Sequence, residues 1–232
     1  MKRSIFAVVM AVVVGFVFAV GLCVKALLVA QPVAAFDVGM RIALDAGHGG
    51  TDGGVLGKVT KVKESDLNLE ITLRLADILK DMGFEVTLTR KTEAGLYGTA
   101  TKGFKRRDME KRREIIRSAS PNLVVSIHQN QYPLSATRGA QVFYKRADKN
   151  GENFACLAQE NLNTLYAEQG VKARKATPAE YFILDCVSVP SILVECGFLS
   201  SAKDEELLIS GVWQQRIAEN IASAIAAYLG SA

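Results

Sequence analysis

Short apolar segments alternate with segments of helical periodicity along most of this chain, and this alternation limits the folds open to it. Residues 123–127 form a continuous apolar run, typical of a strand that is buried on both faces of a sheet. A helix stopped by Gly83 is indicated by the spacing of Leu67, Ile71, Leu75, Ile78 and Met82. Such alternation favours an α/β fold, with a mainly parallel sheet and helices on both faces.

The remaining elements follow from the same patterns. Strands are predicted at 41–44, 84–89, 123–127, 140–144, 181–184 and 191–194, and helices at 108–118, 154–165 and 213–228. The chain has 232 residues without a repeat or a low-complexity tract. We therefore expect a single folded domain over residues 39–232.

The first 38 residues differ from the rest. Lys2 and Arg3 precede an uncharged apolar run, 5–24, that is long enough to cross a bilayer. The run exceeds the usual apolar core of a signal peptide, but Val-Ala-Ala at 33–35 is an acceptable cleavage site. We favour a retained signal anchor over a removed signal peptide. Either way, the preceding positive charges place the domain outside the cytoplasm, anchored to the membrane or secreted.

The four cysteines give little support for a disulfide framework, because Cys23 lies in the apolar run and three remain. A bridge between Cys186 and Cys196 stays open, but we expect these residues and Cys156 to be buried thiols. Cys196 is also a candidate metal ligand. Its neighbour Glu195 argues against this, because adjacent residues of a strand point to opposite faces.

The net charge of +4 is only mildly basic, but cations cluster between residues 102 and 113. The cluster is either a solvated loop and helix face or a contact for an anionic polymer or a partner protein. Few aromatic residues are interleaved with it, so we do not predict nucleic-acid binding.

Four side chains are predicted to meet at one edge of the sheet. His48 and His128, the two histidines of the chain, each follow or end a predicted strand. Glu64 begins the helix after the first strand, and Glu195 follows the strand at 191–194. Ligands of open α/β sheets bind outside the carboxyl ends of the strands. These four residues are therefore expected to form a site.

Two histidines and one carboxylate are a ligand set for catalytic zinc, and a second carboxylate can carry a proton to and from the reacting groups. Taken singly, a histidine after a strand can be structural, and Glu64 suits the first turn of a helix. Glu195 is harder to explain in that way, because a buried unpaired carboxylate is costly. The His-Glu-x-x-His signature of many metalloproteases is absent.

Four segments of the chain resemble the signature segments of the zinc-dependent N-acetylmuramoyl-L-alanine amidases, amidase type 3, and they occur in the same order as in that family. The similarity spans residues 40–229 and rests on Leu44-Asp-Ala-Gly-His-Gly-Gly50, Lys63-Glu64, Ser126-Ile-His-Gln-Asn130 and Leu193-Val-Glu-Cys-Gly-Phe-Leu-Ser200.

The resemblance implies a twisted, mostly parallel six-stranded sheet flanked by helices. It implies one zinc ion per chain on His48, Glu64 and His128, with Glu195 as the catalytic acid and base. The implied reaction is hydrolysis of the amide bond between N-acetylmuramic acid and L-alanine in peptidoglycan. Asn130 is expected either to orient the substrate or to serve only as a turn residue.

Some positions depart from the family pattern. Ala46 stands where proline is common, and Gln129 and Gln131 flank Asn130 where small or apolar residues are usual. These departures concern the shape of the loop and the fit of the substrate. The short anchored layout and the segment Thr101-Lys-Gly-Phe104 are similar to the germination-specific, CwlD-like branch, which makes muramic lactam in spore cortex. An activator or docking protein would fit such an enzyme.

Two other functions remain as alternatives. One is a non-catalytic, membrane-tethered protein that binds peptidoglycan, which the presence of all four site residues disfavours. The other is a zinc peptidase that cuts within the stem peptide. Only the amidase would release peptides with a free L-alanine amino terminus.

Overall fold

The computed structural model describes residues 39–231 of the chain. The signal or anchor segment expected at residues 1–38 lies outside the described residues and stays a prediction. Among the helices of residues 39–231, none is both long enough and apolar enough to cross a membrane.

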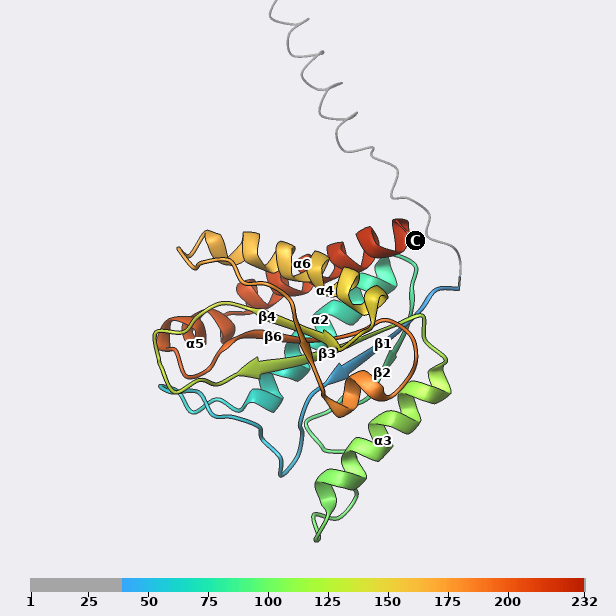
Figure 1. The fold of residues 1–232 in the computed structure, drawn as a ribbon. Coiled ribbons are helices and arrows are strands. Elements are labelled where there is room, and N and C mark those ends of the chain that lie inside the picture. Colours follow the sequence, from blue (N-terminus) through green and yellow to red (C-terminus); the bar gives the residue numbers. More distant parts are fainter. Residues whose placement is uncertain (1–38, 232) are drawn as a thin grey trace, which may run out of the picture. The chain divides into compact units, whose positions relative to one another are not determined.

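A six-stranded sheet with the strand order β2-β1-β3-β6-β4-β5 forms the centre of the domain (Figure 1). The strands are β1 Arg41–Ala46, β2 Glu85–Leu88, β3 Leu123–Asn130, β4 Gln141–Lys145, β5 Thr177–Ala179 and β6 Ser191–Phe198. Four of the five neighbouring pairs are parallel, and β4 runs antiparallel to β6. The expected α/β fold is thus confirmed, with a mixed sheet that is mostly parallel.

Helices cover both faces of the sheet (Figure 1). They are α2 Glu64–Asp81, α3 Phe104–Ala119, α4 Lys149–Ala167, α5 Ala202–Leu208 and α6 Gly211–Gly230, with a short 3₁₀ helix, η1 Phe182–Asp185. Alternate strand residues enter two separate clusters: Leu44 and Val125 pack with α2, α4 and α6, whereas Ala43 and Val124 pack with α3 and η1. This alternation is the period of two that a strand imposes on its side chains.

The strand predicted at 181–184 is wrong. Residues Phe182–Asp185 form the 3₁₀ helix η1, and the edge strand β5 lies just before it. Ile183 and Leu184 are both buried in the same cluster against α3. Neighbouring residues of a strand cannot share one face, but residues of a helical turn can. Pro178 within β5 is tolerated because β5 is an edge strand.

Two strands run further than their apolar runs indicated. β3 continues to Asn130 and β6 to Phe198, so His128 and Glu195 lie within strands rather than after them. Gly197 continues the extended strand, and a Cβ atom there would overlap the hydroxyl of Tyr166. The glycine therefore allows close packing of β6 against Tyr166.

The cysteines of the described residues are free thiols. Cys186 and Cys196 are buried as expected, whereas Cys156 is exposed, contrary to expectation. Cys196 belongs to the cluster with α2, α4 and α6, on the face opposite to that of Leu193. This placement agrees with the argument that Cys196 and Glu195 cannot face the same site.

A buried ion pair joins β1 to α3. Asp45 Oδ1 accepts hydrogen bonds from Arg112 Nη1 at 2.6 Å and from Thr89 Oγ1 at 2.7 Å, while Oδ2 accepts one from Ser126 at 2.7 Å. Arg112 Nε also donates to Asp108 on the preceding helical turn, at 2.6 Å. Burial alone would raise the pKa of Asp45, but Arg112 and the hydroxyl donors outweigh it and lower that pKa to about 2.

The basic cluster at 102–113 is therefore not one surface. Arg112 is 1% exposed and belongs to the core. Arg107 is exposed, yet its guanidinium donates to the carbonyl oxygens of Tyr97, Thr99 and Lys102 and so fixes the loop before α3. For the other exposed cations of the cluster, contact with an anionic polymer or a partner protein stays a prediction.

We predict that Asp45→Asn changes the acid sensitivity of the fold. The lowered pKa means that the stabilisation from the Asp45 carboxylate is complete above the unfolded value of 3.8 and is lost as the pH falls through about 2. At pH 7 the variant should lose about 3–5 kcal/mol of unfolding free energy, because Arg112 is left with an unpaired buried charge. Between pH 5 and 3, its unfolding free energy should fall less than that of the parent.

The measurement is urea unfolding followed by the fluorescence of Trp213 at each pH. Asp81→Asn, at an exposed position, is the control and should give a curve parallel to the parent. A parallel curve for Asp45→Asn over the same acid range would contradict the assignment.

Candidate active site

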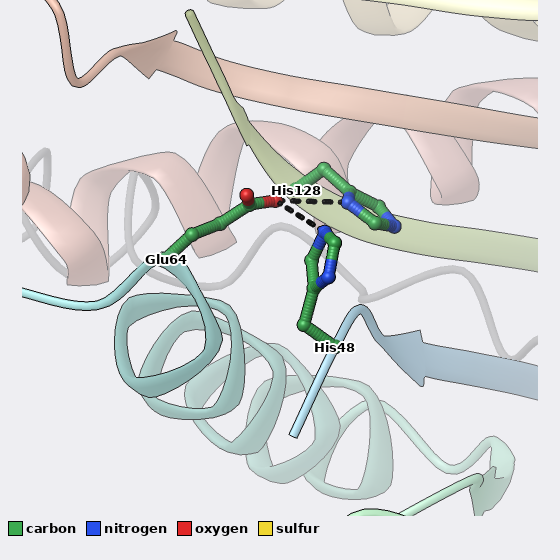
Figure 2. A group of neighbouring side chains, drawn as sticks. All are labelled: His48, Glu64 and His128. Carbon is green, nitrogen blue, oxygen red and sulfur yellow. Dashed lines mark hydrogen bonds and ion pairs between the residues drawn. The ribbon is translucent and has the colours of Figure 1, made fainter. Parts of the chain in front are cut away.

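Three polar side chains converge at the carboxyl ends of β1 and β3 (Figure 2). His48 lies in the loop after β1, Glu64 is the first residue of α2, and His128 lies near the end of β3. Glu64 Oε1 is 2.9 Å from His128 Nδ1 and 3.3 Å from His48 Nε2. The structure thus brings together the three residues that the resemblance assigned to metal binding.

The donor set fits zinc. One nitrogen from each imidazole and one carboxylate oxygen lie within 4.8 Å of one another. Donors of a tetrahedral zinc ion, with bonds of about 2.0–2.1 Å, are about 3.3 Å apart. The separations between Glu64 and the two histidines are close to this value, so small movements of the side chains would suffice for an ion to be held.

The Glu64 carboxylate is held in place by the protein around it. Its Oε2 accepts from the Val55 N–H at 2.9 Å, and its Oε1 accepts from the Gln129 N–H at 3.1 Å and from Asn68 Nδ2 at 3.3 Å. Burial alone would raise the pKa of Glu64, but His128 and His48 lower it well below its ordinary value. Glu64 is thus an oriented carboxylate, the form that binds a metal.

Glycines make room for these side chains. A Cβ atom at Gly47 would overlap the ring of His128, and one at Gly54 would overlap the Glu64 carboxylate. Gly54 also has a φ of +67°, a conformation that other residues rarely adopt. The glycine-rich loop therefore lets the two ligands approach the backbone closely.

The backbone of His48 is strained and is held by buried arginines. His48 has a φ of 61°, which is unusual for a residue with a side chain. Arg112 Nη2 donates to the His48 carbonyl at 2.6 Å, and Arg90 Nη2 donates to the Gly47 carbonyl at 3.0 Å and to the Ser65 carbonyl at 2.7 Å. Arg90 thereby ties the residue before His48 to the residue after Glu64. Such surroundings can maintain a strained backbone at a functional site.

Glu195 lies beside this group, on the neighbouring strand. Its Cα atom is the register partner of His128 in the parallel pair of β3 and β6. Glu195 Oε2 is buried, and no residue of 39–231 forms a hydrogen bond with it. Burial raises the pKa of Glu195 to about 7, and Glu64 adds to this, whereas His128 and His48 act in the opposite direction. A carboxyl group with these properties can take up and release a proton near neutral pH.

A cleft of about 710 Å³ opens beside these four residues. Glu64, His48, His128, Glu195 and Asn130 all line it, together with apolar and aromatic side chains that include Tyr97, Phe104, Tyr181 and Phe182. Asn130 Oδ1 accepts a hydrogen bond from the following Gln131 N–H at 2.8 Å. Its amide therefore has a local turn-like contact while it borders the cleft, so both interpretations of Asn130 stay open.

Several residues that build the site have no clear signal in the sequence. In the sequence, Arg90 and Arg112 cannot be distinguished from cations on the surface, and Asp52 cannot be distinguished from an ordinary polar residue of a glycine-rich loop. A further example is Glu205, which accepts from the Val59 and Thr60 N–H groups at 2.7 Å and so holds the loop before Glu64. Asp45 does give a signal in the sequence, because it is a charged residue next to an apolar run. A buried charge needs a partner, so this position indicates a buried ion pair.

Comparison with known proteins gives consistent results. The profile of the N-acetylmuramoyl-L-alanine amidase family matches residues 42–227. The germination-specific N-acetylmuramoyl-L-alanine amidase of Bacillus subtilis is 34% identical over 193 residues, which cover 82% of this chain and 80% of that protein.

Solved structures agree with this. The CwlD amidase from Clostridioides difficile, solved in complex with the GerS lipoprotein, has 35% identity and a TM-score of 0.79, covering 83% of this chain and 100% of that one. The catalytic domain of CwlV from Bacillus (Paenibacillus) polymyxa has 29% identity and a TM-score of 0.69, covering 82% and 98%. The residues that the family profile matches include His48, Glu64, His128 and Glu195. The chain belongs to the N-acetylmuramoyl-L-alanine amidase family.

Proposed function

We propose that this protein hydrolyses the amide bond between N-acetylmuramic acid and L-alanine in peptidoglycan, and that it requires zinc. One observation carries the proposal. A single open cleft holds a set of metal donors together with the carboxyl group of Glu195, which is not one of the donors. Membership of the amidase family supplies the substrate class.

His48, Glu64 and His128 would hold the ion. A zinc ion bound there would polarise a carbonyl group and favour the loss of a proton from water, and both effects promote amide hydrolysis. The protein fixes the donors through the hydrogen bonds to Glu64 and the arginine contacts along 46–48. These contacts orient the Glu64 carboxylate and the backbone that carries His48.

Glu195 would take a proton from the attacking water on Oε2 and return it to the leaving nitrogen. The register pairing with His128 and the shared cleft support this role, and Oε2 has no partner among residues 39–231 that competes for the proton. The charge of a bound zinc ion would lower the pKa of Glu195 from its value of about 7 and so favour the ionised, basic form.

The biological setting is part of the same proposal. The relative from Bacillus subtilis is named germination-specific, and the CwlD amidase was solved with a lipoprotein. By analogy we place this protein outside the cytoplasm, in remodelling of the cell wall or spore cortex, with a docking protein as its partner. The membrane anchor and Asn130 as a substrate-binding residue belong to this proposal as well.

A test of the products separates the candidate functions. Peptidoglycan treated with the zinc-loaded protein should yield peptides with a free L-alanine amino terminus and intact glycan chains, detected by mass analysis. Cleavage within the stem peptide would favour the peptidase, and binding without cleavage would favour a non-catalytic role.

We predict that zinc content depends on the three donors. The parent should hold one zinc ion per chain, and His48→Ala, His128→Ala or Glu64→Ala should each lower that content because a tetrahedral site with two protein ligands is weak. A chelator should abolish cleavage and added zinc should restore it. Metal analysis that finds full zinc in all three variants would refute the site.

We predict a different failure for Glu195→Gln. This variant should keep its zinc and its unfolding temperature but lose about 10²–10⁴-fold in rate, the usual effect of removing a general base. Glu206→Gln, at an exposed position on α5, is the matched control and should cleave at the parental rate. Parental activity in Glu195→Gln would show that another group moves the proton.

A further inference from the structure

We propose that Asp52 is a positioning residue for His48, acting as the outer hydrogen-bond partner that holds this histidine in the form and orientation needed to bind metal. The inference rests on the proposed zinc site and extends it to a residue outside the donor set. It also explains why the glycine-rich loop carries a carboxylate four residues after the histidine.

The two ring nitrogens of His48 face different carboxylates. Nε2 lies 3.3 Å from Glu64 Oε1, within the donor set, and Nδ1 lies 3.2 Å from Asp52 Oδ2. An imidazole that binds metal through Nε2 must be neutral and must carry its proton on Nδ1. Asp52 is placed to accept that proton in a hydrogen bond, and this bond selects the correct tautomer.

The loop holds Asp52 in position independently of its side chain. Its backbone N–H and carbonyl pair with Gly49 at 3.2 and 2.8 Å, which closes a tight turn directly after His48. The other carboxylate oxygen, Oδ1, is 3.3 Å from Lys105 Nζ on α3. In the described residues Lys105 thus pairs with Oδ1, and Oδ2 is left for His48.

A plain surface ion pair would not have this arrangement. Asp52 and His48 are each about one quarter exposed, and both line the cleft. Together, Glu64 and Asp52 place a carboxylate on each side of the imidazole and resist rotation of the ring. Outer partners of metal-binding histidines typically change metal affinity by about 10–100-fold.

The test is zinc affinity, measured on the full-length chain in detergent by competition with a chromophoric chelator. Asp52→Ala should weaken zinc binding by about 10–100-fold. Asp52→Asn keeps an oxygen that can accept the Nδ1 proton, so it should recover part of the loss. Since the turn is held by backbone bonds, the metal-free unfolding temperature should be close to that of the parent in both variants.

Asp66→Ala is the matched control, because it removes a carboxylate of similar exposure near Glu64 that does not contact a histidine in the described residues. It should leave zinc affinity nearly unchanged. Equal losses in Asp66→Ala and Asp52→Ala would show a general effect of charge and would overturn the inference.

A second readout follows the proton itself. The chain has two histidines, so labelling with ¹⁵N-histidine gives a simple spectrum. The zinc-loaded parent should show a hydrogen-bonded His48 Nδ1–H signal that shifts or disappears in Asp52→Ala. An unchanged signal together with parental zinc affinity would overturn the role of Asp52 but leave the proposed function standing. A parent that neither binds zinc nor cleaves peptidoglycan would overturn both.

Discussion

The buried contact between Arg112 and Asp45 is the constraint on which the geometry of the site depends. An arginine with 1% of its surface exposed is tolerated only if its donors are satisfied, because the cost of removing its charge from water is large. Arg112 meets this requirement with Asp45, Asp108 and the carbonyl oxygens of Ala46 and His48. These partners come from β1, from α3 and from the loop that carries the first histidine. Satisfying one charge therefore fixes three parts of the molecule relative to one another.

A second buried cation, Arg90, adds to this framework. Arg90 donates to the carbonyl oxygens of Ala46, Gly47, Ser65 and Thr92, and within residues 39–231 it has no carboxylate among its hydrogen-bond partners. Burial and the neighbouring charge of Arg112 lower the pKa of Arg90 to about 10, which still leaves it charged at neutral pH. The backbone between the end of β1 and the start of α2 is thus held by charge-assisted bonds to carbonyl groups.

Much of this arrangement can be predicted from the sequence, because it follows from patterns within single segments. The apolar runs at 123–127 and 191–194 locate the central strands, and polar residues just beyond them indicate the site. The contacts of Arg112 and Arg90 cannot be predicted in that way, since a cation in a basic segment is usually solvated and only the fold shows which one turns inward. The run at 181–184 misleads for a similar reason. Its aromatic and branched residues suit a strand, but the space under the sheet requires Ile183 and Leu184 to point the same way.

The pairing of His128 with Glu195 has a consequence for how the site can fail. Their spacing is set by the separation of two hydrogen-bonded strands, about 4.8 Å, rather than by a flexible loop. A slip of β6 by one residue would bring Val194 or Cys196 opposite His128, and both side chains belong to the core on the other face. The carboxyl would then be buried among apolar residues while two apolar side chains were exposed. The register of β6 thus determines both the stability of the sheet and the position of the Glu195 carboxyl group. A chain with a slipped β6 would lose both together.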